Sequence, residues 1–314
     1  MSTSQVIVYH KISEEIDCPD GICAAYFMHN FLKNIMQYPS IEVIGVSHRK
    51  EEEYFGDYQL PFNPTEKDVY ILDFCFPFNI LKEIQNKANS VTILDHHIGN
   101  IQNISAFSKI LTNKMSAAKY SPNEKDCGAT LAWKHCYQNN EYPWFLSHVF
   151  ARDTGTGGFY DGDMPESEAI GEAMSEMRKG LVGAEAFPVF DRLMNASIEK
   201  QKEILERGKE LLQPKYEACE QEISHWLENP VFEKIGEFLS VPVLRIQNSK
   251  NDRFYSWIGT LLSRRYSDIF VAIITTNRPN GYSLRANSKS QIDCSVIAKV
   301  YGGGGHSKAA GFIK

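Results

Sequence analysis

Short apolar runs alternate with helix-like segments through the first half of the chain. The runs are continuously apolar, which is typical of parallel strands buried on both faces. The segments between them carry apolar residues at helical spacing. The runs lie at residues 6–10, 41–47, 69–73 and 90–94, and the helix-like segments at 21–36, 79–88, 128–137 and 166–180. The pattern predicts an α/β domain over residues 1–190, with a parallel sheet and helices on both faces.

The second half predicts a connecting helix and a smaller domain. Residues 197–226 are polar and rich in Lys and Glu, which favours a long helix that is broken or capped near Pro214. We assign residues 191–230 to this helical linker and residues 231–314 to a smaller α/β domain. The elements predicted there are strands at 238–246, 269–276 and 282–285, helices at 255–265 and 292–301, and a hairpin turn at Arg278–Gly281.

Titratable side chains stand where three of the apolar runs end. His10 closes the first run, Asp73 closes the third, and Asp95-His96-His97 ends the fourth. Ligands bind beyond the carboxyl ends of parallel strands, so we expect these groups to lie close together. Alone, such an Asp is usually a helix cap or a loop residue, and a single His is usually structural. Together they favour a metal site, because buried ionisable groups are costly unless they are paired or bind a metal.

The loop after His10 and one later segment supply further candidate ligands. Asp17, Cys18 and Asp20 precede the first helix, and Asp20 is either a helix cap or a ligand. Carboxylates combined with histidine suit Mn²⁺ or Mg²⁺. Taken alone, Asp153 would be explained by a salt bridge with Arg152 or by a role in a turn. It becomes a candidate because a site for two ions needs a further carboxylate.

A glycine run near the C-terminus predicts an anion site. The run, Gly302 to Gly305, precedes His306 and Lys308. Backbone N–H groups of successive glycines can converge on an anion, and the two side chains add charged donors. A flexible linker is the alternative, but a strand-like segment follows directly. Arg285, at the end of the predicted hairpin, is either a bidentate contact to the same anion or a solvated edge residue.

The composition and net charge of the chain limit the kinds of molecule that we expect it to bind. The 314 residues are 43% hydrophobic and 23% charged, with a formal net charge of −6, so we expect no surface for long duplex nucleic acid. No apolar stretch approaches the ~20 residues of a membrane span, and we expect no membrane partner. Seven cysteines without regular spacing, and a start that lacks a leader-like segment, favour the cytoplasm. A homodimer is compatible with the sequence.

These residues together resemble the DHH phosphoesterase superfamily with its DHH-associated C-terminal domain. Its members include RecJ-type exonucleases, nanoRNases, pAp phosphatases and cyclic dinucleotide phosphodiesterases. The order of the motifs is specific for the superfamily and unspecific for the substrate. The matching positions are His10, Asp20-Gly21, Asp73, Asp95-His96-His97, Asp153 and Gly302 to Gly311.

The resemblance implies two Mn²⁺ ions, with Mg²⁺, Co²⁺ or Zn²⁺ as alternatives. His10 and the acidic loop would hold one ion, and Asp73 would bridge both. The other ion would be held by Asp20, His96 and Asp153. Asp95 would orient a ligand, and His97 would contact the scissile phosphate. Water activated between the ions would attack phosphorus in line.

The resemblance also implies a site for the rest of the substrate. That site would be formed by Arg285, Gly303, Gly304, Gly305 and His306. The acidic loop departs from the superfamily, which usually places Asp-x-Asp after the first His; here the triplet is Cys18-Pro19-Asp20. Either Asp17 or Cys18 is then the ligand, or the first ion binds weakly. A thiolate would favour zinc or iron.

The leading hypothesis is a metal-dependent phosphodiesterase acting on short oligonucleotides or small nucleotides. A small substrate fits the acidic balance of the chain better than a long polymer does. One alternative is a phosphomonoesterase or polyphosphatase acting on pAp-like or polyphosphate substrates. Another is a nucleotide-binding regulator whose turnover was weakened when Cys18 replaced a ligand.

Overall fold

The computed structural model describes residues 4–47, 59–110, 117–121, 125–138, 141–154, 166–287, 289–305 and 307–314. Contacts divide the chain into two compact units. Unit 1 comprises residues 1–154 and 174–203, and unit 2 comprises residues 155–173 and 204–314. The boundary at residues 203 and 204 falls inside the linker predicted at 191–230. The predicted division into three parts itself stays a prediction.

Unit 1 is built on a parallel sheet with the strand order β3–β1–β4–β5–β6. The two-residue strand β2 (Ile16–Asp17) pairs antiparallel with the end of β1. Four strands coincide with the predicted apolar runs, whereas β6 is a short strand that carries no such run. The parallel strands are β1 (Ser4–Ser13), β3 (Ile41–Ser47), β4 (Lys67–Leu72), β5 (Ser90–Asp95) and β6 (Ala117–Tyr120).

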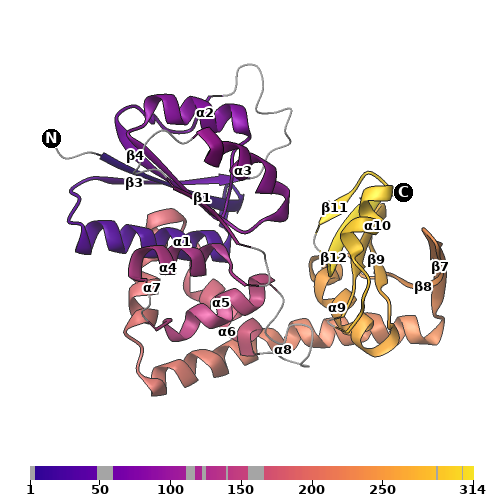
Figure 1. Ribbon diagram of the computed structural model, residues 1–314. Helices are drawn as coiled ribbons and strands as arrows, with labels where there is room; N and C mark the ends of the chain where they lie inside the picture. The colour runs from indigo at the N-terminus through magenta and orange to yellow at the C-terminus, as the bar shows by residue number, and fades with distance from the viewer. Residues whose placement is uncertain are drawn as a thin grey trace. The chain divides into compact units, whose positions relative to one another are not determined.

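Helices cover both faces of this sheet, as predicted (Figure 1). One face packs against α2 (Phe78–Lys87) and α3 (Ile101–Ile110) through an apolar core. The other face packs against α1 (Pro19–Asn30), which is buried from Asp20 to Met28 and contacts α4 (Gly128–Tyr137). The strands are continuously apolar because both faces are covered. The remaining helical elements of unit 1 are η1 (Phe31–Ile35), η3 (Ile98–Asn100), α5 (Trp144–Thr154), η4 (Gly183–Ala186) and α7 (Phe187–Met194). Helix α6 (Glu166–Met177) begins in unit 2 and ends in unit 1.

Unit 2 contains a second, mixed sheet with the order β11–β12–β10–β9–β8–β7, in which β8 and β9 are parallel. Helix α10 (Cys294–Val300) belongs to the core on one face, and α9 (Tyr255–Tyr266) to the core on the other. This is the smaller α/β part that the sequence predicts. Its strands are β7 (Val231–Ile235), β8 (Phe238–Arg245), β9 (Val271–Thr275), β10 (Arg278–Arg285), β11 (Gly304–Gly305) and β12 (Ala309–Ile313).

The long helix predicted around Pro214 is not broken there. Helix α8 runs from Ile198 to Glu228 with Pro214 inside it. Proline removes one backbone hydrogen bond, but residues on both sides are anchored. Leu212 and Cys219 are fully buried, and the neighbouring Lys215 pairs with Glu172. Tertiary packing therefore overrides the local preference to end the helix.

The hairpin turn of unit 2 lies two residues before its predicted position. β9 ends at Thr275, and β10 begins at Arg278, so Thr276 and Asn277 form the turn instead of Arg278–Gly281. The carboxylate of Asp252 accepts hydrogen bonds from the backbone N–H groups of both turn residues and from the Thr276 hydroxyl. Asp252 lies in η5 (Ser249–Phe254), so a contact distant in sequence sets this turn.

None of the helices in the described part of the chain combines the length and the apolar character needed to cross a bilayer.

The glycine run offers a matched pair of substitutions that tests the packing of β11. A Cβ on Gly303 would lie 2.1 Å from the Gly311 carbonyl oxygen, whereas a Cβ on Gly304 would meet nothing within 4 Å. We expect Gly303→Ala to destabilise the protein by about 1–3 kcal/mol, the usual cost of overpacking. Gly304→Ala should be within about 0.5 kcal/mol of the unsubstituted protein. Urea unfolding of both variants checks this, and equal stabilities would contradict it.

Candidate metal centre

Asp73 is the residue around which the other candidates gather. Its backbone N–H donates to the Leu94 carbonyl oxygen at 2.9 Å, so the sheet fixes its position just beyond β4. Its φ of 55° lies in the left-handed region, which aspartate tolerates better than most residues. The residue is 1% exposed. A carboxylate is thus held away from water at the carboxyl edge of the sheet.

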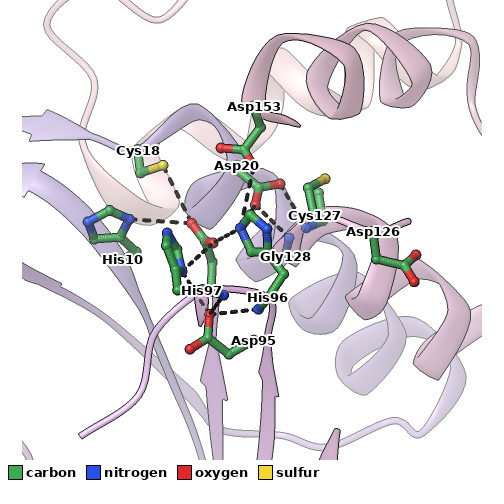
Figure 2. Close-up of polar contacts among 12 residues, drawn as sticks. His10, Cys18, Asp20, Asp95, His96, His97, Asp126, Cys127, Gly128 and Asp153 are labelled. Atoms are coloured by element: carbon green, nitrogen blue, oxygen red, sulfur yellow. Dashed lines mark hydrogen bonds and ion pairs between the residues drawn. The ribbon is translucent and has the colours of Figure 1, made fainter. Parts of the chain in front are cut away.

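The two oxygens of this carboxylate face different partners. Figure 2 labels three of these partners, His10, Cys18 and His96. Oδ1 lies 3.1 Å from His96 Nε2. Oδ2 lies 3.4 Å from His10 Nδ1 and 3.5 Å from Cys18 Sγ. Two groups of possible ligands therefore share Asp73: His10, Asp73 and His97 form one, and Asp20, Asp73 and His96 form the other. Within each group the ligand atoms lie within 4.8 Å of one another.

Asp153 joins the second group from a distant part of the chain. It lies in α5, and its Oδ2 is 3.3 Å from His96 Nε2. Asp20 Oδ2 is 3.6 Å from the same nitrogen. The structure therefore brings together His10, Asp20, Asp73, His96 and Asp153, as the sequence predicts. The side of Asp73 facing His96 is richer in carboxylates than the side facing His10.

The N-terminus of α4 holds the Asp20 carboxylate. The backbone N–H of Gly128 donates to Oδ2 at 2.6 Å, and that of Ala129 donates to Oδ1 at 2.8 Å. Asp20 therefore caps this helix from outside while it faces His96. A Cβ on Gly128 would lie 2.5 Å from Asp73 Cβ and 2.9 Å from Asp20 Oδ2. Sequence reasoning does not find Gly128, although a glycine opening a helix is the available signal.

Asp95 orients the pair of histidines that follows it. It is fully buried, and its Oδ1 accepts from the backbone N–H groups of His96 and His97. The same oxygen is 2.8 Å from His97 Nδ1, while Oδ2 accepts from Asn100 Nδ2 at 2.6 Å. Asp95 is thus placed to orient rather than to bind an ion. Asn100 is a supporting residue that the sequence does not single out.

Asp17 does not join the cluster. Its Oδ1 accepts from the Tyr9 hydroxyl at 2.6 Å, and its Oδ2 accepts from the Gly183 N–H at 2.8 Å. Strand β1 and η4 therefore engage both of its oxygens. Of the two alternatives left open by the sequence, Cys18 is the one that faces Asp73.

The pKa values of the clustered side chains show that positive charge would stabilise the ionised carboxylates. Burial and the nearby Asp73 raise the pKa of Asp20 well above its ordinary value, and the same causes raise the pKa of Asp153 to about 6. Burial alone would lower the pKa values of the histidines, but the carboxylates raise that of His96 to about 9 and that of His97 to about 10. Carboxylates that repel one another and hold protons on histidine fit a site for divalent cations.

Asp73 behaves differently from its carboxylate neighbours. Burial disfavours its charged form, but hydrogen bonds with His10 and His96 hold its pKa below the ordinary value. It therefore stays ionised between the two groups of ligands.

In unit 2, Arg285 is buried and anchored rather than solvated. Its guanidinium donates to the Ser256 and Ser283 hydroxyls and to the Leu284 carbonyl oxygen, and it lies 5.5 Å from the centre of the Tyr255 ring. It lines a pocket of about 1450 Å³ together with Gly302 to Gly305. The structure therefore groups Arg285 with Gly303, Gly304 and Gly305. His306 lies outside the described residues.

Part of the glycine run has a structural task. The N–H groups of Gly302 and Gly303 donate to the Lys299 and Ala298 carbonyl oxygens and end α10. Gly302 has a φ of 73°, which a glycine adopts without strain.

Comparison with known proteins places this fold. No protein-family model matches the chain. The uncharacterized protein R106 of Acanthamoeba polyphaga mimivirus is 23% identical over 322 aligned positions, which cover 98% of this chain and 66% of that protein. The chain therefore spans slightly less than two thirds of this relative's length.

Among solved structures, the DHH domain of PF0399, a member of the s1p family of ribosomal proteins, has a TM-score of 0.58 at 12% identity, covering 98% of this chain and 82% of that one. A pGpG-specific phosphodiesterase, PggH from Vibrio cholerae, has a TM-score of 0.49 at 12% identity, covering 99% and 92%. RecJ of Thermus thermophilus in complex with Mn²⁺ has a TM-score of 0.46 at 12% identity, covering 99% and 49%. The likeness to PF0399 shows that the chain has the fold of DHH-domain proteins, as its motifs predict.

Gly128→Ala tests the close approach of α4 to the cluster. The added methyl group would press on Asp73 and Asp20, so we expect it to weaken Mn²⁺ binding at least ~10-fold, as disturbing the support of a metal ligand does. Gly99→Ala is the matched control, since a Cβ there meets nothing within 4 Å. Isothermal titration with Mn²⁺ measures both. Equal affinities of the two variants would contradict the role of Gly128.

Divalent cations should stabilise the protein more at neutral than at acid pH. The raised pKa values of Asp20 and Asp153 mean that their ionised forms destabilise the cation-free fold. For Asp153 this cost is complete above a pH of about 6 and shrinks as the pH falls from there toward the ordinary pKa of 3.8. Protons then compete with cations for the carboxylates. At a Mn²⁺ concentration 100 times the Kd we expect about 2.7 kcal/mol of stabilisation near pH 7.5. Thermal unfolding should show a smaller gain near pH 5, and an equal gain would contradict this.

Proposed function

We propose that this protein is a metal-dependent phosphoesterase that hydrolyses short oligonucleotides or small nucleotides. The observation that carries the proposal is the Asp73 carboxylate, whose two oxygens face separate groups of ligands. Sites that hold two cations through a shared carboxylate are typical of phosphoester hydrolysis, because phosphate oxygens carry negative charge in the substrate and in the transition state.

In this proposal His10 and Asp73 hold one divalent cation, and Asp20, Asp73, His96 and Asp153 hold the other. When bound, the cations supply Lewis acidity and lower the pKa of water at the site. We propose Mn²⁺ for the carboxylate-rich side, where hard oxygen donors dominate. The Asp20 and Asp153 carboxylates have to be ionised in the loaded site, and His96 has to be neutral.

His97 is proposed to contact the scissile phosphate. Its hydrogen bond with Asp95 fixes the ring, and the pKa of His97 near 10 keeps it protonated in the cation-free protein. A protonated ring attracts the phosphate anion and stabilises charge on its oxygens. Asp95 is therefore a positioning residue, and Asn100 holds it through the second carboxylate oxygen.

The pocket of unit 2 supports a nucleotide as the substrate class. Exposed Arg253 and Arg278 line it, and they suit phosphate groups. Tyr255, 38% exposed, offers a ring face on which a base can stack. A volume of about 1450 Å³ suits a small nucleotide or a short oligonucleotide better than a duplex. We propose that this pocket binds the part of the substrate that does not react.

Asp73→Asn tests the proposed activity. The substitution keeps the shape of the side chain but removes the charge shared by both groups of ligands, so we expect turnover of a labelled dinucleotide with Mn²⁺ to fall by at least about a hundredfold. Asp126→Asn is the control. Asp126 is also a buried aspartate near the start of α4, but it bonds Ser121, Thr130 and Lys134.

We expect Asp126→Asn to retain most of the turnover at a temperature where it is folded. Unchanged turnover in Asp73→Asn would refute the proposed site. If the unsubstituted protein instead binds nucleotides without releasing mononucleotides, with Mn²⁺, Co²⁺ or Zn²⁺ present, it is a regulator and not an enzyme.

A further inference from the structure

A thiol lies beside the carboxylate shared by both groups of ligands. Cys18 is 8% exposed, and its Sγ is 3.5 Å from Asp73 Oδ2. The same oxygen is 3.4 Å from His10 Nδ1. Cys18 and His10 therefore flank one oxygen of Asp73, while His96 lies against the other.

The backbone fixes the thiol in this place. Cys18 is the residue before α1, and Pro19 is the first residue of that helix. Gly21, in the first turn of α1, lets the helix approach β1 so closely that a Cβ there would lie 2.5 Å from the His10 carbonyl oxygen. The start of α1 and the end of β1 are thus locked together, and Cys18 is held near His10.

Asp17 does not compete for this position. The Tyr9 hydroxyl and the Gly183 N–H occupy its two oxygens, and these contacts tie it to β1 and η4 instead of to Asp73.

The two sides of Asp73 consequently offer different chemistry. The side of Oδ2 offers the nitrogen of His10, the sulfur of Cys18 and one carboxylate. The side of Oδ1 offers the nitrogen of His96 and the carboxylates of Asp20, Asp73 and Asp153. Thiolate and imidazole ligands select zinc or iron, whereas carboxylate-rich sites suit manganese or magnesium.

We propose that Cys18 is a thiolate ligand and that the centre is mixed, with a thiophilic ion such as Zn²⁺ or Fe²⁺ beside His10 and Cys18 and a hard ion such as Mn²⁺ beside Asp20 and Asp153. This inference rests on the proposed function in one respect, because both require a centre that holds two ions. It goes further by assigning a different kind of ion to each position, whereas the carboxylate shared by the two positions does not distinguish between them.

A second thiol near the cluster provides the matched control. Cys127 is fully buried and precedes α4 next to Gly128, on the Asp20 side of the site. Its side chain accepts from the backbone N–H of Thr130, and that contact caps α4. Serine can keep this contact, so Cys127→Ser removes a neighbouring thiol while the cap is preserved.

Titration of the anaerobic protein with Co²⁺ tests the ligand without using turnover. A sulfur–cobalt bond gives a charge-transfer absorption that nitrogen and oxygen ligands do not give. We expect this absorption in the unsubstituted protein and in Cys127→Ser, and its loss in Cys18→Ser and Cys18→Asp. Persistence of the absorption in both Cys18 variants, or its absence from the unsubstituted protein, would overturn the proposal.

Competition between Cd²⁺ and Mn²⁺ provides a second measurement. Cys18→Asp replaces the soft ligand with a hard one, so we expect Cd²⁺ affinity at one of the two positions to fall at least ~10-fold, while Mn²⁺ affinity there is equal or higher. An unchanged ratio of the two affinities in Cys18→Asp overturns the assignment. Thermal unfolding of each variant establishes that it is folded before titration.

The outcomes separate this inference from the proposed function. If Mn²⁺ binds and dinucleotide is hydrolysed but no sulfur–cobalt absorption appears, the function stands and the mixed centre is wrong. If the absorption appears and depends on Cys18 while no phosphoester is hydrolysed, the mixed centre stands and the function is wrong.

Discussion

The crowding of carboxylates around Asp73 is the constraint on which the rest of unit 1 depends. Asp20, Asp73 and Asp153 all lie close to His96 Nε2, and like charges so near one another are unfavourable away from water. The cation-free protein meets part of this cost by keeping His96 and His97 protonated, with pKa values of about 9 and 10. Bound divalent cations would supply more charge and release those protons.

The surrounding structure holds these groups together against their repulsion. Gly21 brings α1 against the end of β1, and Gly128 brings α4 against Asp73. The N–H groups at the start of α4 give Asp20 two hydrogen bonds, which also favour its charged form. A Cβ on Gly21 would press on the backbone of His10, and a Cβ on Gly128 would press on the side chains of Asp73 and Asp20. The close packing of α1 and α4 therefore holds the charged side chains of one site near one another.

The sequence predicts the parts of this site that follow from the arrangement of strands in a parallel sheet. Parallel strands place their carboxyl ends at one edge, so residues that end apolar runs are expected to meet there, and His10, Asp73 and His96 do. It leaves Asp17 and Cys18 as alternatives, because the choice depends on a contact with Gly183, far along the chain. For the same reason, the sequence does not predict that α8 continues through Pro214. Nor does it predict the position of the turn that Asp252 holds. Contacts between distant residues decide them, and no local pattern records such contacts.

The glycine run shows why a motif and its chemistry have to be argued separately. Gly302 ends α10 with a positive φ, and Gly303 allows β11 to lie against β12. Both glycines would be needed for folding even if nothing bound there. A Cβ would meet nothing within 4 Å at Gly302 or at Gly304. Gly302 has a positive φ and Gly304 does not, so the glycine at 304 is explained neither by packing nor by backbone conformation. The case for substrate binding in unit 2 therefore depends on the neighbouring pocket, with its exposed arginines and the Tyr255 ring supported by buried Arg285, more than on the run itself.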